Sequence, residues 1–522
     1  MSKKSIILGL SLTAALTTAA LVPSAFAEPP TGAAGTMNIS ETPPEKPGNE
    51  PGNGSSNVSY TGVMTITEDI ATDGQTYESV NDSENAILMT GGVATLANPS
   101  IKKTGGADGD NADFYGTNAA VLVSGGTMNI TGGSVNTNGA HANGVFAYDE
   151  GVVNISNTNI KTTANNSGAL MVTGGGTLSA TYVTAETDGN SSAPIRSDRG
   201  GGNMTIGNGS YTSNGVGSPV IYSTANISVT DAKLESTASE GVVIEGKNSV
   251  NLFGVDLIAN NTTLNGQSET YKTIFIYQSM SGDADEGIGS FTAENSKITT
   301  KNGDTFFVTN TTAEIVLKNT TFENTSGDFL RVQAGKWGNA GSNGGQVTLT
   351  ANEQEIRGGI IADNISSISL ALNDDSYFRG TINGANTAQS MFVHLSKDSV
   401  MVLDGDSYIS ELDNDDTENQ NIYSNGHKLF VNGVEVATNS ATAPEGRKNQ
   451  AANTETETEK EEIKEVDDYS TLGFIIAAAA SFLVLVIGGL IIASCARKCR
   501  KEPETPTDLN AEGGQEEGKS GQ

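Results

Sequence analysis

The chain has 522 residues, 61 acidic against 29 basic side chains, a formal net charge of −32 and 62 glycines. This excess of acidic groups disfavours binding to nucleic acid, because such binding depends on Lys and Arg opposite the phosphates. Both cysteines, Cys495 and Cys499, lie near the C-terminus. No disulfide can therefore form in the region before them, which strand pairing and burial must hold together.

The first 27 residues have the features of a secretory signal peptide. Two lysines, Lys3 and Lys4, precede a long apolar run, and the run ends in Ala25-Phe26-Ala27. Residues 28–57 are rich in Pro, Gly, Glu and Ser, a composition that cannot bury a core. We therefore predict an exported chain, residues 1–27 being its signal peptide, in which a disordered segment precedes the folded domain.

From residue 58 to residue 436 a short pattern recurs at intervals of about 23–26 residues, which lies within the range of solenoid repeats. Each unit has an apolar strand centre, a second one about nine residues later and a third about five residues after that. One unit cannot bury a core alone, so neighbouring units must stack. The first strand centre is visible in Ala120-Val121-Leu122, Gly144-Val145-Phe146, Pro194-Ile195-Arg196, Val220-Ile221-Tyr222 and Val243-Ile244-Glu245.

These features predict an all-β fold, a right-handed parallel β-helix of about 13–16 three-sided coils over residues 58–436. A β-sandwich or a propeller is the alternative, but propeller repeats are about 40–50 residues long. The same place in successive units is occupied by polar side chains, which we expect to stack and to form hydrogen bonds along the axis. They are Asn129, Asn154, Ser179, Thr205, Ser228 and Asn251.

The C-terminal part predicts a membrane anchor. Residues 437–470 are polar and read as an acidic stalk, and residues 471–496 are apolar and long enough to span a bilayer as a helix. Arg497, Lys498, Arg500 and Lys501 follow directly. By the positive-inside rule, residues 497–522 form a cytoplasmic tail and the β-helix lies outside the cell membrane, anchored by a single span.

Four segments resemble recurrent segments of secreted, adhesin-like bacterial proteins that have a pectin-lyase-like, right-handed β-helix. The resemblance covers about residues 60–435 and implies the fold and a location on a bacterial surface, but it carries no catalytic residues over. The segments are Phe114-Tyr115-Gly116-Thr117-Asn118-Ala119-Ala120, Asp198-Arg199-Gly200-Gly201-Gly202, Ser239-Glu240-Gly241-Val242-Val243-Ile244-Glu245-Gly246-Lys247-Asn248 and Ile276-Tyr277-Gln278-Ser279-Met280-Ser281-Gly282-Asp283-Ala284.

Alignment of the coils predicts two outward rows on the first strand of each unit. The first row is Leu122, Phe146, Met171, Arg196, Tyr222, Glu245 and Tyr277, and the second, two residues further along, is Ser124, Tyr148, Thr173, Asp198, Thr224, Lys247 and Ser279. Equivalent positions of adjacent coils are neighbours, so aromatic and charged side chains gather. The predicted ligand-binding residues are Phe146, Tyr148, Arg196, Asp198, Arg199, Tyr222, Glu245, Lys247 and Tyr277.

Flat rings stack on sugar faces, while acids and guanidinium groups bind hydroxyls or uronates, so this patch predicts a glycan groove. The alternative is a solvated ladder in which Asp198, Lys247, Arg196 and Glu245 merely form ion pairs, since such pairs on a surface add only about 0–1 kcal/mol. An enzymatic interpretation uses the same residues. Asp198 and Glu245 would be the acid and base of a glycoside hydrolase, or Arg196 and Lys247 the bases of a polysaccharide lyase.

Two further features are candidates for binding. Asp108, Asp110 and Asp113 form an oxygen-rich loop of the kind that calcium prefers, although a solvated acidic turn has the same composition. Calcium is the one cofactor that the sequence suggests. Trp337 lies in a Gly-rich loop between strands, where it could serve as an exposed platform for a sugar or as an anchor of the loop.

Together these features predict a membrane-anchored β-helix of the cell surface that acts as an adhesin or glycan-binding module. Its partners would be an extracellular glycan or the surface of a host or neighbouring cell, and the lipid bilayer through one helix. A polysaccharide lyase or glycoside hydrolase is one alternative, and a passive surface spacer is another.

Overall fold

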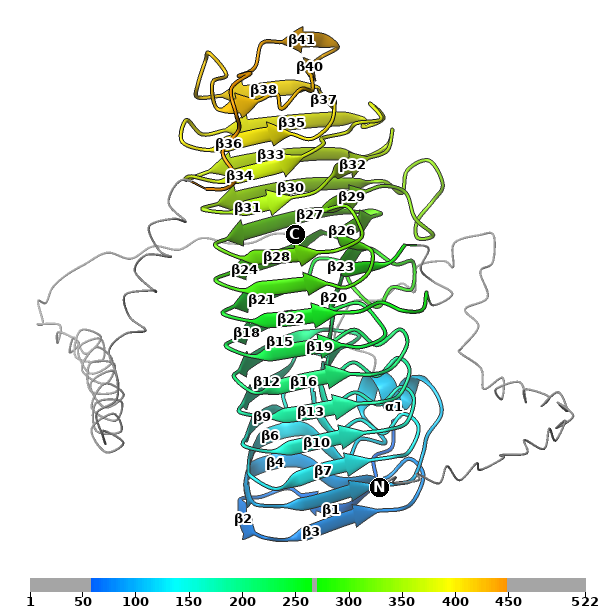
Figure 1. Cartoon of the computed structure of the whole chain (residues 1–522). Coiled ribbons are helices and arrows are strands. Elements are labelled where there is room, and N and C mark those ends of the chain that lie inside the picture. The colour runs from blue at the N-terminus through cyan, green and yellow to red at the C-terminus, as the bar shows by residue number, and fades with distance from the viewer. Residues whose placement is uncertain (1–57, 265–269, 448–522) are drawn as a thin grey trace, which may run out of the picture. The chain divides into compact units, whose positions relative to one another are not determined.

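The computed structural model describes residues 58–264 and 270–447. Within them the chain forms a parallel β-solenoid of about 15 turns, as the repeat predicted, with almost no helix (Figure 1). The predicted signal peptide, the segment 28–57, residues 448–470 of the stalk, the apolar segment 471–496 and the tail 497–522 lie outside the described residues. No described helix is both long and apolar enough to cross a bilayer.

Most coils have three strands, and like strands of successive coils pair in parallel to form three faces. The first face consists of β1 (Gly62–Ile66), the first halves of β4 (Asn85–Ala97) and β6 (Val121–Thr131), β8 (Val145–Tyr148), β11 (Leu170–Thr173), β14 (Ile195–Ser197), β17 (Ile221–Ser223), β20 (Val242–Glu245), β23 (Lys272–Tyr277), β26 (Asp304–Thr309), β29 (Leu330–Val332) and β32 (Ile360–Ala362).

The long strands β4 and β6 turn the corner and continue into the second face, so the first two faces count as one sheet. The second face also contains β2 (Ile70–Asp73), β9 (Val152–Ser156), β12 (Gly176–Thr181), β15 (Gly202–Gly207), β18 (Asn226–Thr230), β21 (Ser249–Phe253), β24 (Ile288–Glu294), β27 (Thr311–Lys318), β30 (Gly345–Asn352), β33 (Ser367–Asn373), β35 (Ser390–Leu395) and β38 (Glu411–Asn414).

The third face is formed by two sheets in succession. They contain β3 (Thr76–Ser79), β5 (Ser100–Lys103), β7 (Ser134–Thr137), β10 (Asn159–Thr162), β13 (Thr184–Thr187), β16 (Ser210–Ser213), β19 (Lys233–Ser236), β22 (Asp256–Ala259), β25 (Lys297–Thr300) and β28 (Thr321–Asn324), then β31 (Glu355–Arg357), β34 (Tyr377–Gly380), β36 (Val400–Leu403) and β39 (Ile422–Tyr423).

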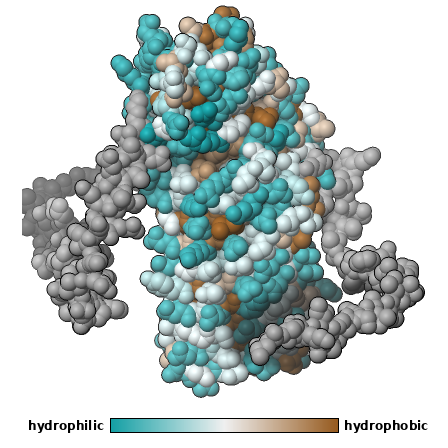
Figure 2. All heavy atoms as spheres, viewed as in Figure 1, coloured by the Kyte–Doolittle hydropathy of each residue, from teal (hydrophilic) through white to brown (hydrophobic). Residues whose placement is uncertain are grey.

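The core is a continuous column of inward side chains from all three faces. Along each strand, buried inward residues alternate with outward ones, because successive side chains of a strand point to opposite faces. In β9, for example, Val153 and Ile155 are buried while Asn154 between them is exposed. Figure 2 shows that the surface in view is mostly hydrophilic or neutral, with hydrophobic residues in small separate patches.

The corner between the second and third faces depends on one residue in the left-handed conformation. Asn98, Asn157, Asn208 and Asn295 all occupy it, with φ of 47°, 52°, 59° and 50°. Asn tolerates this conformation better than other residues with a side chain, apart from Asp. The Asn157 N–H also donates to the Thr181 carbonyl at 3.1 Å, so the ladder of hydrogen bonds between coils continues through the turn.

The predicted polar stack is present on the second face. In the strand register, Asn129 pairs with Asn154 and Asn154 with Ser179, and the row continues to Asn251 through Thr205 and Ser228. Asn154 Nδ2 donates to Asn129 Oδ1 at 3.0 Å, which is the hydrogen bond along the axis that the sequence predicted.

The C-terminal end of the solenoid is closed by a hairpin. β40 (Leu429–Val431) pairs in parallel with β37 (Ser407–Ile409) and antiparallel with β41 (Val434–Val436), the one antiparallel pairing of named strands in the described chain. Residues 437–447, the first part of the predicted stalk, lie against the third face. The Tyr377 hydroxyl donates to the Pro444 carbonyl at 2.9 Å, and Arg447 Nε donates to the Asp375 carbonyl at 3.0 Å.

We expect Phe306→Ala to lower the free energy of unfolding by about 3–5 kcal/mol, because it empties a fully buried site. The Phe306 ring is 5.4 Å from that of Phe329 and 5.5 Å from that of Phe291 inside the column. The matched control is Phe392→Ala on β35, where the side chain is 41 % exposed and the loss should stay below about 1 kcal/mol. Urea unfolding measures both, and equal losses would contradict the assignment of the core.

Candidate functional site

The predicted outward rows of the first face are present as far as Tyr222. Beyond Tyr222 the predicted alignment of the coils was wrong by two residues. Tyr222 pairs with Val243, and Val243 with Phe275. Glu245 and Tyr277 pair with each other in the next row. The cause is a short coil, since only 21 positions separate Tyr222 from Val243, against 26 for the coil before it. A shift of two residues keeps both side chains on the outward face.

A loop covers the N-terminal part of this face. Residues 104–120 include the short helix α1 (Asp110–Tyr115), and beneath them Leu122, Phe146 and Met171 are completely buried in an outer apolar cluster. Tyr148 lies at the edge of this cluster, with its ring edge-on to that of Tyr115 at 5.6 Å. Phe146 and Tyr148, which the sequence assigned to the ligand site, therefore hold the loop in place.

Three contacts hold α1 against the solenoid. Asp113 accepts hydrogen bonds from His141 Nδ1 with both carboxylate oxygens at 3.0 Å, and Thr173 Oγ1 donates to the Phe114 carbonyl at 2.6 Å. The Arg199 guanidinium lies over the Phe114 ring at 4.1 Å. These contacts place Phe114 as a wall at the end of the covered part.

A second loop closes the face further along the axis. Asn343 Nδ2 donates to the carbonyls of Gly335 and Trp337 at 2.8 and 2.9 Å, which fixes the loop through its backbone. The Trp337 ring then packs at 5.6 Å on that of Tyr277, which is stacked on Phe275 with centroids 4.4 Å apart. Trp337 is thus half-buried and held in place with its loop, and its predicted role as a platform for a sugar stays a prediction.

Between the two loops lies a cleft of about 390 Å³. Five aromatic rings line it: Phe114, Tyr222, Phe275, Tyr277 and Trp337. Five carboxylates line it as well: Asp113, Asp198, Glu240, Glu245 and Asp283. The lining cations are Arg196 and Lys272. Five of the predicted site residues, namely Arg196, Asp198, Tyr222, Glu245 and Tyr277, therefore meet in one cavity.

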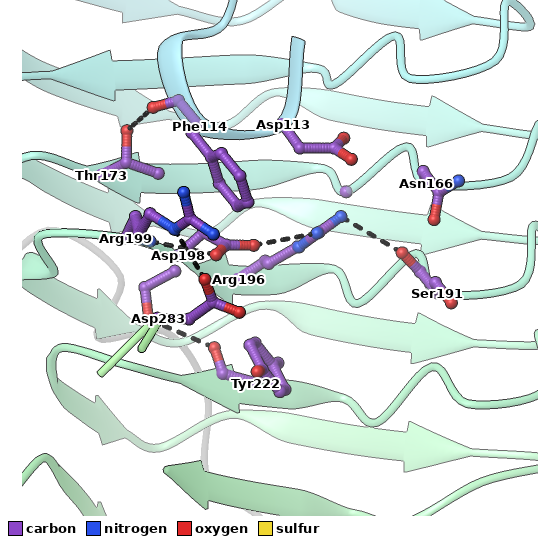
Figure 3. Close-up of polar contacts among 12 residues, drawn as sticks. Asp113, Phe114, Asn166, Thr173, Ser191, Arg196, Asp198, Arg199, Tyr222 and Asp283 are labelled. Carbon is purple, nitrogen blue, oxygen red and sulfur yellow. Dashed lines mark hydrogen bonds and ion pairs between the residues drawn. The ribbon is translucent and has the colours of Figure 1, made fainter. Parts of the chain in front are cut away.

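Arg196 and Asp198 form a nearly buried ion pair on β14 and just after it (Figure 3). Arg196 Nη2 donates to Asp198 Oδ2 at 3.0 Å, and Nη1 donates to the Ser191 carbonyl at 3.2 Å. The other Asp198 oxygen accepts the Arg199 N–H at 3.0 Å. Burial raises the pKa of Asp198 to about 7 with help from Asp283, and Arg196 opposes the rise.

Arg199 connects two parts of the wall. Its Nε donates to Asp283 Oδ1 at 2.6 Å while its guanidinium covers the Phe114 ring. Asp283 comes from the loop after β23 and Phe114 from α1, so one side chain joins segments that are far apart in the sequence. Arg199 is half-exposed at the edge of the cleft, and Figure 3 shows its side chain between Phe114 and Asp283.

Glu245 is the centre of a buried hydrogen-bond network. Its Oε2 accepts the hydroxyls of Tyr222 and Tyr277 at 2.7 and 2.8 Å, and its Oε1 accepts the Ser279 hydroxyl. Burial raises the pKa of Glu245, and these three hydrogen bonds oppose the rise. Burial and the neighbouring carboxylate also raise the pKa of both tyrosines well above the usual value, so the hydroxyls stay protonated donors.

Lys272 and Glu240 form a second buried pair, at 3.2 Å. The Lys272 ammonium also lies 4.4 Å from the centre of the Phe275 ring, and Glu240 accepts the Ser239 hydroxyl at 2.6 Å. Burial lowers the pKa of Lys272, while the attraction of Glu240 opposes that change. The sequence did not single out this pair, because neither residue lies in the aligned rows.

Lys247 and two of the three predicted calcium ligands, Asp108 and Asp110, do not line the cleft. Lys247 is exposed outside it and pairs with Asp285 at 2.9 Å. Asp108 and Asp110 are exposed, whereas Asp113 is bound to His141. In the described residues no three His, Cys, Asp or Glu side chains gather as a set of metal ligands. The calcium site stays a prediction without support from this geometry.

The residues that the sequence missed, such as Phe114 and Asp283, come from long coils. From Leu88 to Leu122 the row advances by 34 positions and from Phe275 to Phe307 by 32, against 25 from Phe146 to Met171. The extra residues form the loops over the first face. The length of a coil could therefore have predicted which coils form the walls of the cleft. It could not have predicted which side chains make contact there.

Comparison of the chain with protein-family models, with curated proteins and with solved structures finds no match. The resemblance to pectin-lyase-like adhesins therefore has support at the level of the parallel β-solenoid only.

We expect the stability of the wild-type protein to fall relative to that of Asp198→Asn as the pH rises from about 4 to about 7. The folded Asp198 carboxyl keeps its proton up to about pH 7, whereas an unfolded aspartate loses it near pH 4, so folding binds a proton between these values. The relative loss should reach at most about 4 kcal/mol and end above pH 7. Urea unfolding across this pH range measures it, and parallel curves for the two proteins would refute it.

Proposed function

We propose that the protein is a carbohydrate-binding protein of the cell surface, of the adhesin type. The observation that carries the proposal is the meeting of five aromatic rings with hydrogen-bonding groups in one concave cleft. Its volume of about 390 Å³ lies in the range of sites for small ligands, which combine apolar walls with a few placed polar groups. A pyranose offers the matching surfaces, since its C–H face is apolar and its edge carries hydroxyls.

The positions of the rings favour binding. Phe275 and Tyr277 are stacked and remain 8 % and 7 % exposed at the floor, while Tyr222 and Trp337 are half-buried beside them. The Glu245 carboxylate fixes two of these rings through their hydroxyls. A floor that is ordered before the ligand arrives loses little entropy on binding.

Catalysis by the same residues has less support. A general acid or base must reach the proton that it transfers. Both oxygens of Glu245 already accept hydroxyls, and both oxygens of Asp198 accept N–H groups. The lyase alternative needs Lys247, which lies outside the cleft, and Arg196, whose guanidinium is bound to Asp198.

One observation nevertheless favours a glycoside hydrolase as the second candidate. Asp198 has a pKa near 7, suited to a general acid, and Glu245 lies two coils away, about 10 Å along the ladder. Carboxyl groups of inverting enzymes are about 6.5–9.5 Å apart. Incubation with polysaccharides followed by an assay for new reducing ends decides the question, because activity lost in Asp198→Asn would replace the binding proposal.

The membrane topology is part of the proposal. We take residues 1–27 as a signal peptide and residues 471–496 as a single span, on the strength of their apolar runs and flanking charges. Residues 448–470 would then connect the solenoid to a cell membrane, with the tail 497–522 inside the cell. We also take the winding of the coils to be right-handed, which is the rule for parallel crossovers, and the host to be bacterial, as the resemblance implies.

We expect Trp337→Ala to weaken binding to a glycan found on a carbohydrate array by about tenfold or more, because it removes one aromatic wall. The loop should persist, since Asn343 holds it through backbone carbonyls. The matched control is Phe253→Ala, an exposed ring on β21 of the second face, which should bind as the wild type does. Equal affinity for all three proteins would exclude this cleft as the site, and an array without any ligand would favour a passive spacer.

A further inference from the structure

The charges that line the cleft are unequal. Five carboxylates face two cations among the lining residues, and the carboxylates of Asp198, Glu240 and Glu245 are at most 6 % exposed. Arg199 adds a third cation at the edge, bound to Asp283. A cleft with low-dielectric walls concentrates the field of such an imbalance. Its interior is therefore unfavourable for an anion.

Each of these cations also has its own carboxylate. Arg196 pairs with Asp198 at 3.0 Å, Lys272 with Glu240 at 3.2 Å, and Arg199 with Asp283 at 2.6 Å. A uronate that enters the cleft would have to take a cation from a carboxylate already bound to it. That exchange would leave an unpaired carboxylate in a nearly buried position, which is costly.

Uncharged hydroxyls meet no such obstacle. They can donate to the remaining lone pairs of carboxylate, tyrosine and serine oxygens, so every contact is compatible with the charges already present. The half-buried rings of Tyr222 and Trp337 offer their surfaces to an uncharged sugar and a charged one alike, since each sugar presents the same C–H face. Charge, not stacking, is thus the property by which this cleft can discriminate.

The walls limit the length of the ligand. Phe114 stands at one end of the cleft along the axis and Trp337 at the other. Between them the first face offers β14, β17, β20 and β23, and three steps of about 4.8 Å between adjacent strands give an open floor about 14 Å long. A floor of this length takes a short oligosaccharide or one end of a longer chain.

We propose that the cleft accepts a short uncharged oligosaccharide and rejects chains of uronic acid. The proposal rests on the carbohydrate-binding function above and gives it a ligand class. It differs from the lyase alternative, in which Arg196 and Lys247 are the bases that act on a polysaccharide, because Arg196 is bound to Asp198 and Lys247 lies outside the cleft.

The test compares matched sugars on the full-length chain by titration calorimetry. Galactotriose, maltotriose and mannotriose are each paired with the trimer of the corresponding uronic acid, which differs mainly by a carboxylate at C6. We expect at least one neutral trimer to bind, and its uronate to bind at least tenfold more weakly at pH 8. A uronate that binds equally well or better would overturn this inference and leave the carbohydrate-binding function standing. Failure of all six to bind, together with a carbohydrate array without a ligand, would overturn both.

Two matched variants test the cause of the discrimination. Asp283→Asn removes a lining carboxylate and releases Arg199 at the edge of the cleft, so the ratio of uronate affinity to neutral-sugar affinity should rise about tenfold. Asp285→Asn removes the partner of Lys247 outside the cleft. In this variant the ratio of uronate affinity to neutral-sugar affinity should stay as in the wild type. If the affinity ratio stayed unchanged in Asp283→Asn, or rose equally in both variants, the charge of the cleft would not be the cause of the discrimination.

Discussion

The parallel, in-register pairing of successive coils is the constraint on which the rest of this structure depends. No coil has a core of its own, and each strand finds its hydrogen-bond partners in the coil before and the coil after it. Inward positions thereby become one apolar column, and outward positions become rows. Residues such as Arg196 and Tyr222, which are 26 positions apart, are neighbours for this reason alone.

The cleft shows how a regular scaffold acquires an irregular site. Strands supply a flat floor, and the loops of the long coils, around Phe114 and Trp337, supply the walls. Charged and hydroxyl side chains then connect floor and walls, as Glu245 does for two tyrosines and Arg199 for two loops. Burial of these groups has an energetic cost that is visible in the raised pKa of Asp198. Perturbed pKa values of this kind cluster at functional sites, although structural ion-pair networks produce them too.

The sequence predicted the fold well because the fold repeats. The three strands per coil, the number of coils and the Asn129–Asn154 stack follow from apolar spacing and from equivalent positions, and all are present. The site was harder, since it depends on departures from the repeat. One coil is five residues shorter than the coil before it, so Glu245 lies one row away from its predicted position. The loop that contains α1 buries Phe146, which the pattern had placed in solvent. Ion pairs such as Lys272–Glu240 join residues of neighbouring coils whose spacing no repeat fixes.

The direction of the ladder hydrogen bonds has a mechanical consequence. These bonds run along the axis of the solenoid, so a pull between its two ends loads every ladder in series and favours rupture between coils, one interface at a time. Arg199 opposes this separation of coils, because its contacts with Phe114 and Asp283 connect loops that start from different coils. The edge of the cleft is thus also a place where side chains connect coils that are not adjacent in the solenoid.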